Sequence, residues 1–279
     1  MSGKRPEHQA PPEIFYNESE ARKYTSNTRM IEIQVQMTER AIELLCLPED
    51  EPALLLDLGC GSGLSGSVLE EAGHVWVGMD ISKAMLEVAV EREVEGDLVL
   101  SDLGQGVPFR AGMFDGAVSV SALQWLCNCD HNSHNPVKRL NKFFTMLYTA
   151  LGRCARAVFQ FYPESPSQVQ LVTTQATKAG FYGGLVIDYP NSTKAKKYFL
   201  VLMTGQSMAL PPALGTSGHG EDNSHVQYEN KRLTHKQMKG KPLKKSRDWI
   251  NEKKERRKRQ GQEVRENSKF TGRRRCGKF

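Results

Sequence analysis

Three glycines and a carboxylate near residue 60 have the types and spacing of a ligand-binding turn. Gly59, Gly61 and Gly63 follow a short apolar run and precede a helical pattern, and Asp57 stands two positions before the first of them. Glycine permits a tight turn and a close approach of the backbone to a ligand, and the following helix presents free N–H groups. The G-x-G-x-G spacing differs from the G-x-G-x-x-G of dinucleotide-binding enzymes. A carboxylate at Asp57 would repel a pyrophosphate and attract an ammonium group.

A second carboxylate, Asp80, stands about 20 residues further on, at the end of the next predicted strand. An acid at that place can accept hydrogen bonds from both hydroxyls of a ribose. The turn and the two acids together predict a ligand that joins an adenosine-type ribose to an amino acid and has no phosphates. The alternatives are a dinucleotide dehydrogenase and a glycine turn that only closes a strand–helix junction.

The elements that must position these residues alternate between strands and helices. Strand patterns cover residues 53–58, 74–79, 97–100, 114–121, 155–162, 184–188 and 197–203. Helical patterns cover residues 65–72, 82–93, 136–151 and 167–179. This order predicts an α/β fold with a doubly wound, mostly parallel sheet of seven strands, in which ligands bind at the carboxyl ends of the strands.

Composition predicts further segments around this domain, which we assign to residues 51–205. Residues 1–12 are polar and are expected to be a disordered lead, and residues 13–50 an N-terminal helical extension with one helix over 18–47. Residues 206–230, rich in Pro, Gly, Ser and His, read as a linker. No secretory signal is visible, no apolar run approaches the roughly 18 residues of a membrane span, and six scattered cysteines indicate reduced thiols of an intracellular protein.

Charge is divided unevenly along the chain. The 279 residues carry a formal net charge of +6. Residues 231–279 contain 20 basic and five acidic residues, whereas the preceding 230 residues contain 18 basic and 27 acidic ones. An acidic body with a basic tail indicates a polyanionic partner, most often nucleic acid.

The glycine turn, with the acids after consecutive strands, resembles the first motif of class I S-adenosylmethionine-dependent methyltransferases. The resemblance implies S-adenosyl-L-methionine as the cofactor. It assigns the methionine part to Asp57 and the glycine turn, the ribose to Asp80, and the amine of the adenine ring to Asp102. The complete set of expected cofactor-binding residues is Asp57, Gly59, Gly61, Gly63, Asp80, Ile81, Asp102, Leu103 and Ser119, with Ile81 and Leu103 on either side of the ring.

A more specific resemblance lies in residues 114–126, which read FDGAVSVSALQWL. This segment is similar to the eukaryotic small-subunit ribosomal-RNA guanine-N7 methyltransferases, the Williams–Beuren-region family. Residues 15–24, 175–181 and 188–192 and the Arg/Lys-rich end agree with it. The resemblance implies methylation of guanine N7 in small-subunit rRNA, a role in small-subunit biogenesis, and a nuclear location (nucleolus and nucleoplasm), with the cytoplasm as a further one. It also implies a heterodimer with a small zinc-binding activator subunit.

The end of the fourth strand faces the crevice of such a sheet, so the residues after it are candidates for the substrate pocket. These candidates are Ser121, Gln124 and Trp125, and Tyr162 and Pro163 at the end of the fifth strand are candidates for a second wall. Guanine N7 has a lone pair and no proton, so its methylation needs alignment and exclusion of water and no catalytic base. Trp125 could stack on the guanine; packing in the core is the alternative.

The basic tail contains two clusters separated by a short gap, in a helical pattern. Their residues are Lys244, Lys245, Lys253, Lys254, Arg256, Arg257, Lys258 and Arg259. Such clusters suit nuclear import and phosphate contacts on RNA, and a solvated charged tail is the alternative. We expect the tail to bind rRNA or pre-ribosomes with a salt-dependent affinity.

The third strand is expected at the edge of the sheet. An exposed strand edge invites strand addition by another protein, so we expect the activator to pair along Asp97, Leu98, Val99 and Leu100 and to cover apolar surface near Val75 and Val77.

The spacing of Cys127, Cys129, His131 and His134 is too tight for the usual structural zinc site, so no metal is expected. Two other functions stay open: a pre-ribosome-binding scaffold for which methylation is dispensable, and a small-molecule methyltransferase with an incidental tail.

Overall fold

The computed structural model describes residues 5–48, 51–129, 134–192, 195–205 and 210–215, and the positions 247, 250, 251, 254 and 265–267. The chain divides into two compact units, Met1–Gly220 and Glu221–Phe279. All the helices and strands named below belong to the first unit. Within the described residues, no helix is both long and apolar enough to cross a membrane.

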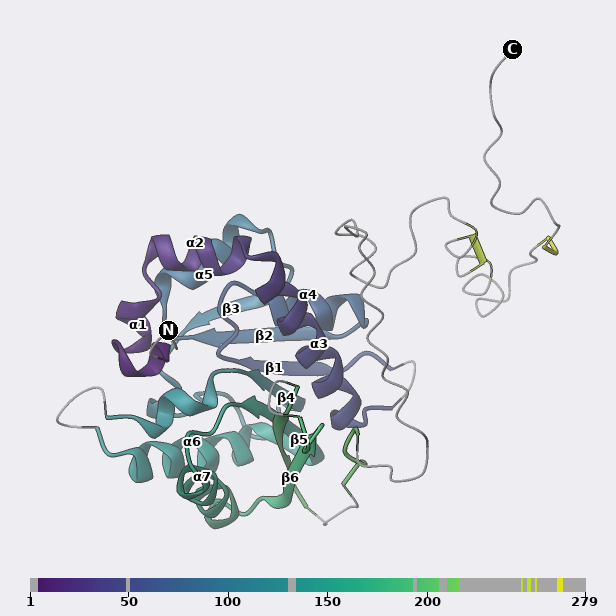
Figure 1. Ribbon diagram of the computed structural model, residues 1–279. Coiled ribbons are helices and arrows are strands. Elements are labelled where there is room, and N and C mark those ends of the chain that lie inside the picture. Colours follow the sequence, from purple (N-terminus) through teal and green to yellow (C-terminus); the bar gives the residue numbers. More distant parts are fainter. Residues whose placement is uncertain are drawn as a thin grey trace. The chain divides into compact units, whose positions relative to one another are not determined.

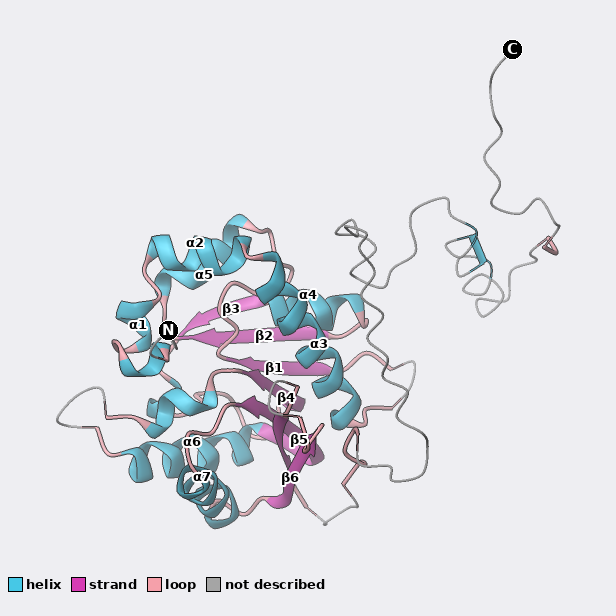
Figure 2. Ribbon diagram, in the orientation of Figure 1, coloured by secondary structure: helices cyan, strands magenta, loops and turns pink. Residues whose placement is uncertain are grey.

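A sheet of seven strands forms the centre of the first unit (Figure 2). The strands are β1 (Leu54–Leu58), β2 (Val75–Asp80), β3 (Asp97–Leu100), β4 (Phe114–Val120), β5 (Leu151–Phe161), β6 (Tyr182–Asp188) and β7 (Lys197–Met203). Their order is β3-β2-β1-β4-β5-β7-β6, and β7 alone runs antiparallel to its neighbours β5 and β6. The predicted doubly wound, mostly parallel sheet is confirmed, and the carboxyl ends of β1 to β4 meet at one edge.

Helices cover both faces of this sheet, as Figure 1 shows. They are α1 (Pro12–Phe15), α2 (Glu18–Ser26), α3 (Thr28–Leu45), α4 (Leu64–Glu71), α5 (Lys83–Glu91), α6 (Pro136–Ala150) and α7 (Pro166–Lys178). Short 3-10 turns are η1 (Pro6–His8), η2 (Leu103–Gln105) and η3 (Leu123–Cys127).

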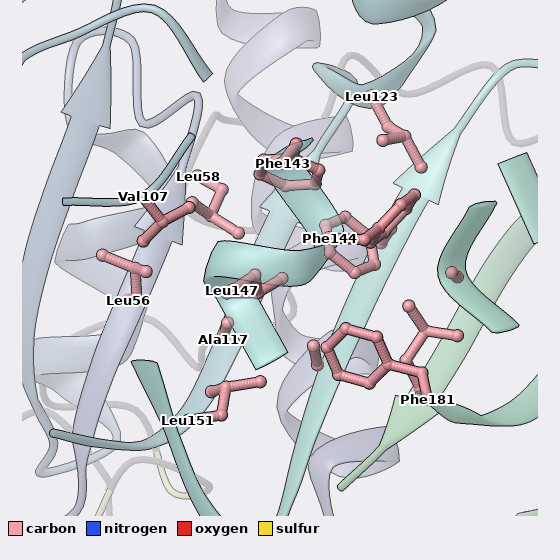
Figure 3. Close-up of a cluster of buried hydrophobic side chains, with 14 of the residues drawn as sticks. Leu56, Leu58, Val107, Ala117, Leu123, Phe143, Phe144, Leu147, Leu151 and Phe181 are labelled. Carbon is pink, nitrogen blue, oxygen red and sulfur yellow. The ribbon is translucent and has the colours of Figure 1, made fainter. Parts of the chain in front are cut away.

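The hydrophobic core has two parts because the sheet is buried on both sides. On one face, Phe143, Phe144 and Leu147 of α6 pack against Leu56 and other strand residues (Figure 3). On the other face, side chains of α3, α4 and α5 pack against β1, β2 and β4. Burial on both faces explains why the strands read as continuous apolar runs in the sequence.

The N-terminal segment differs from the prediction of a disordered lead. From residue 5 on it lies against the domain: Arg5 donates a hydrogen bond to the carbonyl oxygen of Tyr162 at 3.0 Å, and Asn128 donates one to the carbonyl oxygen of Glu7 at 3.3 Å. The predicted helix over 18–47 is two helices, because Asn27 has an extended backbone and its side chain accepts from the N–H of Met30, which caps α3.

The chain after the sheet also differs from the prediction of a linker starting at residue 206. Arg40 of α3 donates to both carboxylate oxygens of Asp188 at 3.0 and 3.2 Å, and to the carbonyl oxygen of Pro212 at 2.9 Å. The N–H of Leu214 donates to the same carboxylate at 2.8 Å. Residues 210–215 are therefore attached to α3 and to the end of β6.

Candidate active site

A cavity opens at the carboxyl ends of β1, β2, β3 and β4. Six of the nine predicted cofactor residues line it: Gly59, Gly61, Asp80, Ile81, Asp102 and Leu103. They come from the three loops that follow β1, β2 and β3, which parallel strand order places side by side. The parallel order of β1, β2 and β3 thus brings these six residues together at one edge of the sheet.

The glycine turn needs its glycines for two separate reasons. Gly59 and Gly61 have φ values of 78° and 54°, which other residues rarely adopt. A Cβ on Gly59 would lie 2.3 Å from the Cβ of Ala122, and one on Gly61 would lie 2.8 Å from the Met85 side chain. The turn is thus a cradle closed by the chain after β4. Gly63 is the N-cap of α4 and does not line the cavity, and a Cβ on it would lie 2.8 Å from the Val94 side chain.

Asp80 is held in place by backbone groups of two loops. Its Oδ2 accepts from the N–H of Gly61 at 2.9 Å, and its Oδ1 accepts from the N–H of Ser82 at 2.8 Å. Burial raises its pKa, while these hydrogen bonds lower it. A carboxylate offers about four lone-pair sites, so acceptor capacity remains for the two hydroxyls of a ribose.

Asp57 lies behind the cavity and is not part of its lining. The side chain is fully buried; its Oδ2 accepts from the Ser65 hydroxyl at 2.5 Å, and its Oδ1 has no hydrogen-bond partner. Burial raises the pKa of this carboxyl to about 7. Ser65, to which Asp57 is hydrogen-bonded, lines the cavity itself. A ligand in the cavity would therefore contact Ser65, and Asp57 would act on the ligand from behind it.

Asp102 has a partner that the sequence analysis missed. Arg139 of α6 donates two hydrogen bonds to its carboxylate, at 2.9 and 3.1 Å, and the N–H of Gly104 donates a third at 2.8 Å. Arg139 also lines the cavity and has little exposure. Residues 102 and 139 are 37 positions apart, so no local pattern could have paired them. The fork fixes the carboxylate beside the predicted adenine position.

Ser119 does not line the cavity, contrary to the prediction. Its hydroxyl is buried and donates to the carbonyl oxygen of Leu58 at 2.7 Å. It therefore links β4 to β1. The next serine on the same face, Ser121, does line the cavity and has a φ of 59°. Its backbone N–H and its hydroxyl both donate to Gln160, at 2.9 and 2.8 Å, which stabilises this uncommon backbone conformation.

A second cavity adjoins the first on the side of the N-terminal segment. Of the predicted substrate-pocket residues, Ser121, Gln124, Trp125 and Tyr162 line it, and Pro163 does not. The two cavities share five lining residues: Tyr16, Tyr24, Gln34, Ser121 and Trp125. A ligand in one cavity would therefore lie next to a ligand in the other.

Aromatic rings form the boundary between the two cavities. The ring centroids of Tyr16 and Trp125 are 5.9 Å apart, those of Phe15 and Trp125 are 6.2 Å apart, and those of Tyr16 and Tyr24 are 5.9 Å apart. Burial raises the pKa of Tyr16 to about 12 and also raises that of Tyr24, so both phenols stay neutral at physiological pH. The N-terminal helices thus supply walls that the sequence analysis had placed outside the catalytic domain.

The predicted partner edge lies where expected. β3 ends the sheet order, and Leu100 and, on the neighbouring strand, Val75 are exposed by 57% and 61%. Asp97 is exposed, and Leu98 and Val99 are half-buried. The prediction that Val77 contributes to this surface is wrong, because its side chain is 7% exposed and packs in the hydrophobic core.

Lys254 is the one predicted tail residue that falls within the described positions. Its Nζ donates to the carbonyl oxygen of Glu266 at 3.2 Å and to Asn267 Oδ1 at 2.9 Å. The others lie outside the described residues: Lys244, Lys245, Lys253, Arg256, Arg257, Lys258 and Arg259. Among the residues that the structure describes, no group of three or more His, Cys, Asp or Glu side chains could hold a metal ion.

The fold and the first cavity define the class of protein. A solved structure of magnesium protoporphyrin IX methyltransferase from Synechocystis, with S-adenosylmethionine bound, matches with a TM-score of 0.51 and 16% identity, over 74% of this chain and 100% of that one. Residues 56–151 match a family model described as a methyltransferase domain. The chain is a class I S-adenosylmethionine-dependent methyltransferase, which excludes the dehydrogenase alternative.

Full-length relatives identify the family. The 18S rRNA (guanine-N(7))-methyltransferase of Mus musculus is 57% identical over 99% of this chain and 98% of its own length. The 18S rRNA (guanine(1575)-N(7))-methyltransferase of Saccharomyces cerevisiae is 49% identical over 99% of both. Residues 202–277 match a model described as a methyltransferase involved in Williams-Beuren syndrome. The chain belongs to the family of 18S rRNA (guanine-N7)-methyltransferases, and its cofactor is S-adenosyl-L-methionine, as the sequence predicted.

The residues of the first cavity fit this cofactor. Gly59 and Gly61 line the cavity, and a Cβ at either position would collide with the side chain of Ala122 or Met85. Asp80 retains acceptor capacity for a ribose, and the unpaired Oδ1 of Asp57 lies close behind the turn. When bound, the cofactor supplies a methyl group on a positively charged sulfur, which neutral phenols and carboxylates accommodate better than basic groups would.

Proposed function

We propose that this protein transfers the methyl group of S-adenosylmethionine to N7 of a guanine in 18S rRNA and acts in small-subunit biogenesis. The observation that carries the proposal is the pair of adjoining cavities, with Ser121, Tyr16 and Trp125 at their shared wall. One cavity fits the cofactor, and the other is lined by aromatic side chains suited to a base taken out of its stack.

Methylation of guanine N7 requires alignment of the reacting atoms and does not require proton transfer. Guanine N7 is already an unprotonated nucleophile, so the chain's residues have to hold N7, the methyl carbon and the sulfur in line and exclude water. The rings of Tyr16 and Trp125 hold the base by stacking, while Asp80 and the glycine turn fix the cofactor. No residue needs to act as a general base.

The relatives' names extend the proposal to the partner RNA. The Mus musculus and Saccharomyces cerevisiae enzymes are named for 18S rRNA, and we propose the same substrate here. The 20 basic residues after position 230 supply the phosphate contacts, and the same clusters direct the protein to the nucleus. Removing residues 231–279 should weaken binding to the pre-ribosome and reduce its salt dependence.

We also propose that the free edge of β3 binds a small zinc-binding activator subunit. A groove beside this edge is lined by α2, α5 and β3 and includes the exposed apolar residues Val90 and Leu100. Strand addition would pair the backbone of β3 and cover these side chains. Co-expression with the activator tests this, with Leu100→Glu as the disrupting variant. Full yield and activity of the chain alone would contradict the proposal.

The decisive test of function maps N7-methylguanosine in 18S rRNA of cells that express wild-type protein, Asp80→Lys or the control Glu39→Lys, which changes an exposed position of α3. Asp80→Lys should abolish both cofactor binding and the modification, and the control should retain both. Persistence of the modification without this chain would refute the proposal. If subunit maturation proceeds normally with Asp80→Lys, the scaffold function holds; if it fails equally, the scaffold alternative is wrong.

A further inference from the structure

Gln124 has an unusual hydrogen-bonding state at the wall of the second cavity. The residue belongs to η3 and is 6% exposed. Its Nε2 donates to the carbonyl oxygen of Ser121 at 2.7 Å. Because a carbonyl oxygen can only accept, this contact fixes which end of the amide is the nitrogen. The Oε1 atom therefore points the other way, and there it is buried without a hydrogen-bond partner.

A buried acceptor without a partner is costly, and native structures usually explain one by a ligand or a water. Gln124 lines the second cavity beside Trp125, the ring proposed to stack on the base. An acceptor at the edge of a stacking platform can read a donor on the rim of the stacked base. A base that presents an N–H group to this acceptor would satisfy Gln124 Oε1.

A second acceptor lies in the same cavity. The side chain of Glu7 is 8% exposed and lines the second cavity, although it pairs with Arg5 at 3.5 Å. Tyr16 lines both cavities, and burial, with smaller contributions from the charges of Asp80 and Glu7, raises the pKa of its phenol. Glu7 and Gln124 both line the second cavity and not the first.

Guanine has the matching arrangement of donors. Its N7 and O6 are acceptors, whereas N1–H and the N2 amine on the opposite, Watson–Crick edge are donors. A guanine with N7 toward the first cavity would direct N1–H and the amine into the second. Adenine offers an unprotonated N1 and a C–H at these places, so it would leave Gln124 Oε1 unpaired.

We propose that Gln124 Oε1, assisted by Glu7, accepts hydrogen bonds from the Watson–Crick edge of the target guanine and thereby selects guanine. The inference rests on the proposed function, whose substrate base it explains. It makes Gln124 a specificity-determining residue that touches the substrate. It also requires the target base to be unpaired when bound.

The test uses RNA oligonucleotides that differ only in the target base. Guanosine is compared with inosine, which lacks the N2 amine, and with 2-aminopurine riboside, which lacks N1–H and O6. Single-turnover methylation is measured for wild-type protein and for Gln124→Met, which keeps the shape and removes the acceptor. The matched control is Gln34→Met in the same cavity, whose side chain is already paired with the Tyr24 hydroxyl at 2.7 Å.

We expect wild-type protein to favour guanosine over at least one analogue by roughly 5- to 150-fold, the range of a good base-reading contact. In Gln124→Met this preference should fall to within about threefold, whereas Gln34→Met should keep the wild-type ratio whatever its rate. A wild-type protein without preference, or a preference that survives in Gln124→Met, would overturn the inference.

Binding of the same oligonucleotides in the presence of S-adenosylhomocysteine gives the same ratios without turnover. This measurement separates the two proposals. If guanosine RNA is not methylated but is bound with a preference that Gln124→Met removes, the proposed function fails and the inference holds. Retained cofactor affinity of Gln124→Met shows that the variant is folded.

Discussion

Replacing Asp57 by Asn should make the protein without cofactor more stable at neutral and alkaline pH. The substitution keeps the size of the side chain and the oxygen that accepts from the Ser65 hydroxyl. It removes a carboxyl that is fully buried and has one oxygen without a partner. Burial of the charged form is costly, so an amide that never ionises avoids the cost.

The magnitude follows from the pKa. Burial raises the pKa of Asp57 from 3.8 to about 7, and each tenfold change in the acid dissociation constant corresponds to about 1.4 kcal/mol. The protonated form favours the folded state, so this stabilisation is complete below pH 3.8 and is lost as the pH rises through 7. Between pH 5 and 8 the loss amounts to about 3 kcal/mol. The Asp57→Asn variant should show no such loss.

The assay is urea denaturation of both proteins, without cofactor, at pH 5 and pH 8. Taking the difference between the two free energies of unfolding cancels the other titrating groups. The free energy of unfolding of Asp57→Asn, relative to that of the wild-type protein, should therefore rise by about 3 kcal/mol between pH 5 and pH 8. Asp97→Asn, at an exposed position of β3, is the matched control variant. If Asp57→Asn behaves like this control, the reasoning from burial is refuted.

Three further predictions concern the cofactor cavity and the fold. Wild-type protein should bind S-adenosylmethionine more tightly as the pH rises from 6 to 8, by up to about tenfold, because ionised Asp57 attracts a cation. Calorimetric titration of Asp57→Asn should show an affinity that does not depend on pH in this way. An equal pH dependence in the two proteins would contradict the prediction. Gly59→Ala should weaken cofactor binding by more than about 100-fold, because its Cβ would lie 2.3 Å from the Cβ of Ala122. The control Gly112→Ala, with a φ of 68° but open space around it, should lose only about 1 kcal/mol of stability and no cofactor affinity. Equal cofactor affinities of the two variants would refute this prediction. Arg40→Met should lower the free energy of unfolding by about 3–5 kcal/mol because it leaves the buried carboxylate of Asp188 without its cationic partner. Arg22→Gln, which removes an exposed pair, should cost much less in the same urea titration.

The strands and the turn were predictable because their signals are local. The apolar runs and the glycine spacing each lie within a few residues, and right-handed parallel topology then brings Asp80 and Asp102 to the glycine turn. The break at Asn27 also had a local signal, an Asn three residues before the N–H that it caps, which the longer apolar periodicity concealed.

Other features could not be predicted from the sequence because they depend on contacts between residues that are far apart along the chain. The fork of Arg139 on Asp102 and the contact of Arg5 with Tyr162 join residues 37 and 157 positions apart. The polar composition of residues 5–12 favoured disorder, and only the finished surface of the domain gives them partners. Ser119 and Ser121 look alike in sequence, but β4 ends between them: Ser119 stays within the sheet, whereas Ser121 follows the strand with a positive φ and lines the cavity.

The N-terminal wall of the site also sets an order of events during synthesis. Phe15 and Tyr16 leave the ribosome early, but their ring partner Trp125 and the Tyr162 carbonyl that holds Arg5 come much later. At about 5–20 residues per second, the 157 residues between Arg5 and Tyr162 take about 8–30 s to appear. Until Trp125 has been made, Phe15 and Tyr16 lack this ring partner. The second cavity is incomplete until β5 and the following Tyr162 have been made, so until then the newborn chain lacks one wall of the proposed base site.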